Sequence, residues 1–122
     1  MTRLLLVEDD DHQRLLYRED LETEGYEVFE ERDGSRVLAA IERHAPDAVV
    51  LDINMPGPDG LTTLARIHDK HHRLPVILHS AYSAYHEQFR SWLADAYVTK
   101  SSDPTGLRTA VRSALAKARP HD

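Results

Sequence analysis

Cysteine is absent from this sequence of 122 residues, which excludes disulfide bonds and thiolate metal sites and fits a reducing compartment. Long hydrophobic runs are missing too, since none approaches the roughly 20 apolar residues that cross a bilayer. The apolar stretch after Arg3 is too short for a signal peptide. We therefore expect a soluble, cytoplasmic protein that makes no membrane contact.

Basic residues are in the minority, with 15 Lys and Arg against 21 Asp and Glu and a net charge of −6. No segment carries a basic stripe, so we expect no direct binding to nucleic acid. Internal repeats, low-complexity tracts and linkers are also missing. Because the length suits one hydrophobic core, residues 1–122 are expected to form a single domain.

Five short apolar runs have the composition of strands buried on both faces. They lie at residues 3–7, 26–30, 48–52, 75–80 and 96–99. Gly25 and Gly34 interrupt the chain on either side of the second run. Runs of this kind, separated by longer segments, are typical of a parallel sheet.

The segments between the runs show helical spacing of apolar residues. The four stripes are Leu16, Tyr17 and Leu21; Val37, Leu38 and Ile41; Leu61, Leu64 and Ala65; and Tyr85, Phe89, Trp92 and Leu93. A fifth helix is indicated by Asp103 as N-cap, Pro104 at its first position and Leu107 and Val111 on one face. The alternation predicts an α/β, flavodoxin-like doubly wound sheet of five parallel strands in the order 2-1-3-4-5, with five helices.

Sheets of this kind bind ligands at the carboxyl ends of their strands, where the strand order reverses. The first run leads into four acids, of which Asp10 or Asp11 is expected to cap the next helix. Asp52 ends the third run, Ser80 the fourth, and Lys100 follows the fifth. Each residue alone is most often structural or solvated, but their placement at one edge of the sheet indicates a functional site.

Clustered carboxylates either hold a proton or recruit a cation. Oxygen ligands from Glu8, Asp9, Asp52 and a backbone carbonyl suit Mg²⁺ better than zinc or copper. A carboxylate such as Asp52 can act as a nucleophile toward phosphorus once the charge on the transferring group is neutralised. The Lys100 ammonium and the Ser80 hydroxyl are expected to hold phosphoryl oxygens.

Four blocks of the sequence, at residues 4–10, 50–61, 75–81 and 94–100, resemble the signature blocks of response-regulator receiver domains, the chemotaxis-regulator-like switches of two-component signalling. The resemblance implies that Asp52 accepts a phosphoryl group from a sensor histidine kinase or a phosphotransfer protein, as in a phosphorelay. It implies that Glu8 and Asp9 bind Mg²⁺ together with Asp52 and the main-chain carbonyl of Asn54.

The same resemblance assigns Ser80 and Lys100 to the phosphoryl group, and Ser80 and Tyr97 to the switch that follows phosphorylation. The expected output surface comprises the fourth helix, the fifth strand and the fifth helix, which would bind an output domain or target protein and could form a homodimer. The chain would then be a signalling switch that catalyses only its own phosphorylation and dephosphorylation.

The sequence departs from the family pattern in three places. Ser101 stands where the family has a proline after the lysine, Ser80 replaces a commoner threonine, and the bulky Tyr82 follows two residues later. His79 is expected to be a strand residue that faces a helix, in preference to a catalytic base.

Three alternatives remain at this point. A phosphatase with an aspartate nucleophile usually carries a second acid two residues further on, where this chain has Asn54, and would turn over a phosphomonoester. A pseudo-receiver would lack the acids or the lysine. A flavin binder would be coloured, and its phosphate would be repelled by the acidic loop that follows the first strand.

Overall fold

The computed structural model describes residues 1–52, 60–81, 94–101 and 103–117. Tyr82 and the apolar stripe from Tyr85 to Leu93 lie outside these ranges. The expectations attached to them therefore remain expectations. In the part of the chain that the structure describes, no helix is long and apolar enough to cross a membrane.

The five strands form one parallel sheet in the order β2-β1-β3-β4-β5, which confirms the predicted topology. Their bounds are β1 Arg3–Val7, β2 Glu27–Glu31, β3 Ala48–Asp52, β4 Val76–Ser80 and β5 Ala96–Thr99. Three strands match the prediction residue for residue, whereas β2 and β4 each begin one residue later than expected. The strand order reverses between β1 and β3, so their carboxyl ends lie side by side.

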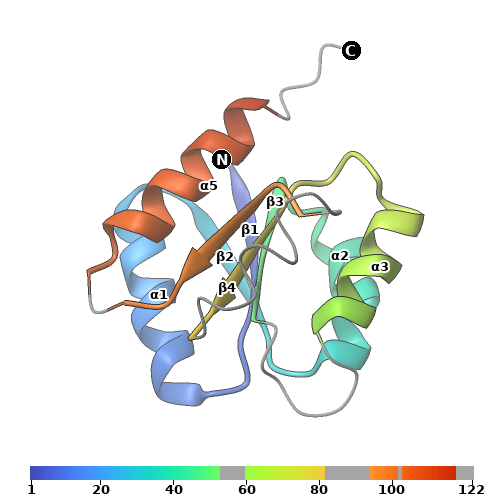
Figure 1. The fold of residues 1–122 in the computed structure, drawn as a ribbon, viewed down its shortest axis with the longest axis horizontal. Coiled ribbons are helices and arrows are strands. Elements are labelled where there is room, and N and C mark those ends of the chain that lie inside the picture. Colours follow the sequence, from blue (N-terminus) through green and yellow to red (C-terminus); the bar gives the residue numbers. More distant parts are fainter. Residues whose placement is uncertain (53–59, 82–93, 102, 118–122) are drawn as a thin grey trace.

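Helices cover both faces of the sheet (Figure 1). The helices are α1 Asp11–Thr23, α2 Val37–His44, α3 Gly60–Lys70 and α5 Thr105–Lys117, with a short 3₁₀ helix at Gly34–Arg36. Figure 1 shows α1 and α5 on one face and α2 and α3 on the other. The described residues thus contain four of the five expected α-helices, and the segment expected to form the remaining one is not described.

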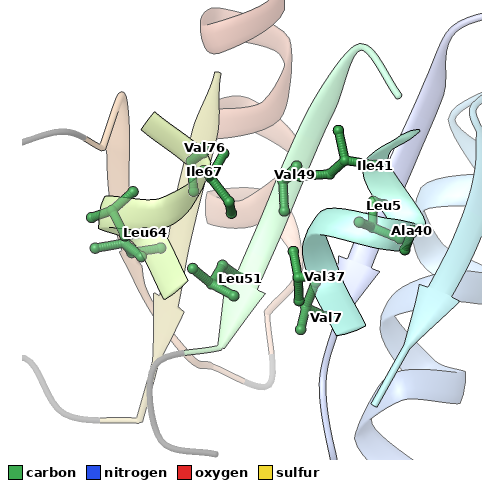
Figure 2. Packing of buried hydrophobic residues seen from close by; sticks show 11 residues of the cluster. Leu5, Val7, Val37, Ala40, Ile41, Val49, Leu51, Leu64, Ile67 and Val76 are labelled. Carbon is green, nitrogen blue, oxygen red and sulfur yellow. The ribbon is translucent and has the colours of Figure 1, made fainter. Parts of the chain in front are cut away.

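Two hydrophobic clusters fill the spaces between the sheet and its helices. One packs α2 and α3 against alternate residues of β1, β3 and β4, among them Leu5, Leu51 and Val76 (Figure 2). The other packs Leu21 of α1 and Val111 of α5 against the opposite face. Because the central strands are buried on both faces, their ends are fixed in space and can hold functional side chains rigidly.

Local signals explain where α1 and α5 begin. The Asp10 carboxylate accepts a hydrogen bond of 2.9 Å from the backbone N–H of Gln13, so Asp10 is the N-cap of α1. The Asp103 carboxylate accepts one of 2.9 Å from the N–H of Thr105, so Asp103 caps the beginning of α5, although the helix begins at Thr105, one residue later than predicted. Gly25 has a φ of +96° in the turn after α1, a conformation that favours glycine.

The apolar stripe predicted for α1 is only partly right. Leu21 is fully buried and Tyr17 packs against the core, but Leu16 is 50% exposed. Leu16 lies one residue before Tyr17, which turns it about 100° around the helix axis and away from the centre of the buried face. Leu16 therefore does not share the buried side of α1 with Tyr17 and Leu21, as its place in the predicted stripe implied.

Candidate functional site

Backbone ladders carry the candidate residues to one edge of the sheet. Glu8 extends β1 by one residue, since its N–H donates a hydrogen bond of 3.0 Å to the carbonyl of Glu31. Lys100 extends β5 in the same way, through a bond of 2.6 Å from its N–H to the carbonyl of Ser80. Asp52 is the last residue of β3, between those two strands in the sheet order. Glu8, Asp52 and Lys100 are thus positioned by regular hydrogen bonding.

The acids form the cluster that the sequence predicts. Glu8, Asp9 and Asp52 each offer a carboxylate oxygen, and these three oxygens lie within 4.8 Å of one another. Glu8 and Asp52 are almost fully buried, at 2% and 3% exposure. We call these three residues the acid cluster.

The Lys100 ammonium lies inside this arrangement. Its Nζ is 2.8 Å from Oε1 of Glu8 and 3.4 Å from Oδ2 of Asp52. It also donates a hydrogen bond of 2.8 Å to Oε1 of Gln13, on the first turn of α1. An ammonium has three protons, and each has an acceptor here.

The charges of the site do not cancel. Three carboxylates against one ammonium leave two negative charges in excess when all four groups are ionised. Burial raises the pKa of Glu8 to about 7, although its hydrogen bond with Lys100 acts in the opposite direction. Burial lowers the pKa of Lys100, but Glu8 and Asp52 more than compensate, so that the net shift is upward. The lysine is therefore charged at neutral pH, while Glu8 is partly protonated.

The acid cluster fits Mg²⁺ by its donor chemistry. All three groups are carboxylates, and a divalent ion would neutralise the excess of two negative charges. Mg²⁺ binds its oxygens at about 2.1 Å, so two bound oxygens are about 3 Å apart at neighbouring positions and about 4.2 Å apart at opposite ones. The acid oxygens, which lie within 4.8 Å of one another, would therefore have to draw together around the ion. Glu8 would hold the ion with an oxygen that now contacts Lys100 or with its other carboxylate oxygen.

The first turn of α1 supports the backbone around Glu8. The Arg14 guanidinium donates a hydrogen bond of 2.8 Å to the carbonyl of Glu8 and others to Asp11 and to Glu30 of β2. The N–H of Asp10 donates to Oε2 of Glu8 over 3.3 Å. The loop that carries two of the three acids is thereby tied to both α1 and β2.

His79 is a strand residue that faces a helix, as expected. It is almost completely buried opposite Asp52 in the ladder between β3 and β4, and its ring meets the ring of Tyr17 edge-on at 4.7 Å. Burial, together with the nearby Lys100 charge, lowers the pKa of His79 to about 4. The imidazole is consequently neutral at physiological pH.

The remaining candidates are placed as follows. Ser80 is fully buried at the end of β4, one residue beyond the partner of Asp52. Tyr97 of β5 is partly buried against the cluster that packs α2 and α3, so the structure does not place it with the acid cluster. Asn54 lies outside the described residues. The Lys100–Ser101 bond is trans, and the Ser101 hydroxyl accepts a hydrogen bond of 3.1 Å from the N–H of Asp103.

Sequence reasoning missed Gln13. Nothing in its spacing or neighbours distinguishes it from a solvated helix residue, because its role depends on where its side chain meets Lys100, 87 residues away. Its separation of four residues from Tyr17, on the same side of α1, is the only available signal.

Known proteins share this architecture. The profile of the response regulator receiver domain matches residues 4–112. Sporulation initiation phosphotransferase F of Bacillus subtilis is 30% identical over 115 residues, which are 93% of each chain. Response regulator MprA of Mycobacterium leprae is 32% identical, but the alignment spans 98% of this chain and only 54% of the relative. The chain thus spans about half the length of many transcriptional regulators that it matches.

Solved structures agree in fold. TrrA from Thermotoga maritima, a response regulator crystallised with Mg(2+)-BeF, superimposes with a TM-score of 0.88 at 38% identity and covers 93% of this chain and 98% of its own. TrrA in complex with the histidine kinase ThkA gives a TM-score of 0.87, also at 38% identity, covering 94% of this chain and 99% of its own. With the matched profile, the strand order and the whole-chain relatives in agreement, this protein belongs to the response regulator receiver domains of two-component signalling.

Proposed function

We propose that Asp52 accepts a phosphoryl group from a phosphohistidine, with Mg²⁺ as cofactor. The observation that carries this proposal is the buried Asp52 carboxylate, which has the Lys100 ammonium at 3.4 Å and two further acids around it. A nucleophile, a fixed cation and a set of hard metal ligands thus lie together at the reversal of the strand order.

Glu8, Asp9 and Asp52 would hold Mg²⁺ through their carboxylates, with the main-chain carbonyl of Asn54 as a further ligand. When bound, the ion supplies positive charge that offsets the charge of the transferring phosphoryl group. The proposal is supported by the all-carboxylate composition of the cluster and by the Mg(2+)-BeF bound to the related TrrA.

In the transfer, an oxygen of Asp52 forms a bond to phosphorus while the bond from phosphorus to the donor imidazole nitrogen breaks. The electron pair of the broken bond stays on that nitrogen. Lys100 would donate a hydrogen bond to one phosphoryl oxygen and Ser80 to another. The dephosphorylated donor then leaves, and the chain would catalyse only its own phosphorylation and dephosphorylation.

A sensor histidine kinase or a phosphotransfer protein would be the donor, as the complex of TrrA with ThkA suggests. Residues 1–122 would form a single cytoplasmic receiver domain that contacts neither nucleic acid nor membrane. It would pass the signal to an output domain or a target protein, since several relatives are transcriptional regulators.

The switch would involve Ser80 and Tyr97. A dianionic group on Asp52 would attract Ser80 and Lys100 and so shift the loops after β4 and β5. Tyr97, the second residue of β5, would change its packing and alter the face formed by the expected fourth helix, β5 and α5. That face would bind the target or a second copy of the chain.

The test uses phosphoramidate and Mg²⁺ with intact-mass measurement of three proteins. Wild type should gain the mass of one phosphoryl group, and Asp52→Asn should gain none. Asp47→Asn is the matched control, because Asp47 lies just before the same strand at its opposite end and accepts a hydrogen bond from the N–H of Arg3. It should be phosphorylated like wild type.

A mass gain in Asp52→Asn, or no gain in wild type, would overturn the assignment of Asp52. Sustained release of product from a phosphomonoester by wild type would favour the phosphatase alternative instead.

A further inference from the structure

Among the residues that the structure describes, Gln13 is the only hydrogen-bond acceptor of Lys100 that carries no charge and lies outside the acid cluster. Its Oε1 atom accepts a hydrogen bond of 2.8 Å from Nζ, as short as the contact between Nζ and Glu8. A lysine ammonium only donates, so the amide of Gln13 must present its oxygen to it. The contact links α1 directly to the end of β5.

The backbone of Gln13 is fixed independently of this contact. Its N–H is the one that the Asp10 carboxylate caps, at 2.9 Å, so the first turn of α1 holds the residue in place. Four residues later, the ring of Tyr17 lies 6.0 Å from Nζ of Lys100 and packs against His79. Gln13 and Tyr17 therefore border the ammonium on its α1 side.

The three acceptors of Lys100 are not equivalent when a metal ion binds. Glu8 and Asp52 belong to the acid cluster, so coordination of an ion would compete with their contacts to the ammonium. Gln13 carries no charge and is not a metal ligand, so its hydrogen bond can persist. Without this hydrogen bond, the long side chain of Lys100 would keep most of its conformational freedom. That freedom would have to be lost when the ammonium binds a phosphoryl oxygen.

We propose that Gln13 is a positioning residue for Lys100, which keeps the ammonium oriented toward Asp52 while the acids bind the metal. This role rests on the proposed function of Asp52 and deepens it. One proton of Nζ stays on Gln13, and the others remain available for Asp52 and the phosphoryl group. The pre-oriented cation then stabilises the charge that develops during transfer.

The first experiment compares phosphorylation by phosphoramidate in wild type, Gln13→Ala and His12→Ala. The neighbouring His12 has an exposed side chain on α1 and serves as the matched control. Gln13→Ala should lower the rate constant by roughly 3- to 10-fold, the order expected for losing one hydrogen bond to a charged group that is partly exposed. His12→Ala should stay within about 2-fold of wild type, and so should the Mg²⁺ affinity of Gln13→Ala.

The same substitution in a Lys100→Ala background separates positioning from a general structural effect. If Gln13 acts through the lysine, Gln13→Ala has no further effect there, whereas an equal loss in both backgrounds would overturn the proposal. A rate for Gln13→Ala equal to that of wild type would also overturn it.

A second readout does not depend on phosphorylation. In ¹⁵N NMR spectra, the Nζ protons of Lys100 should exchange slowly with water in wild type and measurably faster in Gln13→Ala, because one acceptor is lost. Unchanged exchange contradicts the role of Gln13, whatever the rate data show. Absence of phosphorylation in wild type with altered exchange in Gln13→Ala would overturn the function proposed for Asp52 and leave the contact between Gln13 and Lys100 supported.

Discussion

At the scale of single residues, Glu8 shows how burial makes a carboxylate responsive to pH. Its pKa is raised to about 7 by burial, above the value of 4.5 expected in the unfolded chain. Between about pH 4.5 and 7, Glu8 therefore binds more protons in the folded protein than in the unfolded chain. The metal-free site thus holds a proton that Mg²⁺ must displace.

Glu8 should contribute stability to the metal-free protein that falls as the pH rises from about 4.5 to 7, because a carboxylate with a raised pKa loses this contribution as it ionises. The lowered pKa of His79 acts in the opposite direction between about pH 4 and 6.5, so the two contributions largely offset each other in wild type. Over the same interval the affinity for Mg²⁺ should rise and then level off. Urea unfolding and calorimetric titration at several pH values measure the two trends. Glu8→Gln removes the contribution of Glu8, so its stability should rise more steeply with pH over this interval than that of wild type, and an unchanged slope would show that Glu8 does not hold the proton.

Ala45 provides a second prediction at this scale. It caps α2 with a left-handed backbone at φ +47°, which glycine adopts without strain. Ala45→Gly should therefore stabilise the protein by about 1 kcal/mol in urea unfolding. Ala39→Gly, on the exposed side of the same helix, should destabilise it by about 1 kcal/mol. Equal effects at the two positions would mean that Ala45 is not strained.

At the scale of elements, α1 links the core to the functional edge. Leu21 is buried against the sheet near the end of the helix, while Gln13 and Arg14 contact Lys100 and Glu8 at its beginning. Pairs between α1 and α5 add to this, with Arg108 bonded to Asp20 at 2.9 Å. The position of α1 therefore bears directly on the geometry of the site.

Two leucines of α1 should respond very differently to truncation. Leu21→Ala should cost about 3 kcal/mol in the free energy of unfolding, because it leaves a cavity at a fully buried position. Leu16→Ala should cost less than about 1 kcal/mol, since half of that side chain is exposed. Similar losses for both variants in denaturant unfolding would support the stripe inferred from spacing alone.

At the scale of the whole molecule, the sequence was informative wherever burial or backbone rules act. Apolar runs between helical segments allow few topologies, and the strand order 2-1-3-4-5 followed from them. The meeting of Glu8, Asp9 and Asp52 followed from that order, since each lies at or just after the end of a strand. Family resemblance added roles for these residues and for Lys100.

What could not be predicted depends on long-range side-chain contacts. The bond between Gln13 and Lys100 joins residues 87 positions apart and leaves no periodic signal. The exposure of Leu16 depends on a rotation of one residue around the helix, which spacing alone does not fix. β2 and β4 each begin one residue later than predicted, because the end of a strand depends on where its partner strand pairs with it.

Metal binding should stabilise the entire fold by mass action. At a Mg²⁺ concentration of 100 times the dissociation constant, the free energy of unfolding should rise by about 2.7 kcal/mol. Thermal unfolding with and without Mg²⁺ measures the effect, and Asp9→Asn should largely remove it. An equal rise in Asp9→Asn would show that the ion binds elsewhere.

The position of the phosphoryl group tests the central claim most directly. After treatment with phosphoramidate and Mg²⁺, borohydride reduces an aspartyl phosphate to homoserine, which tandem mass spectrometry locates in the chain. Our account predicts homoserine at position 52 and at no other acid of the cluster. Homoserine at position 9 or 10, the corresponding alcohol of glutamate, 2-amino-5-hydroxypentanoic acid, at position 8, or the absence of any such product from a protein that has gained the phosphoryl mass, would contradict the account.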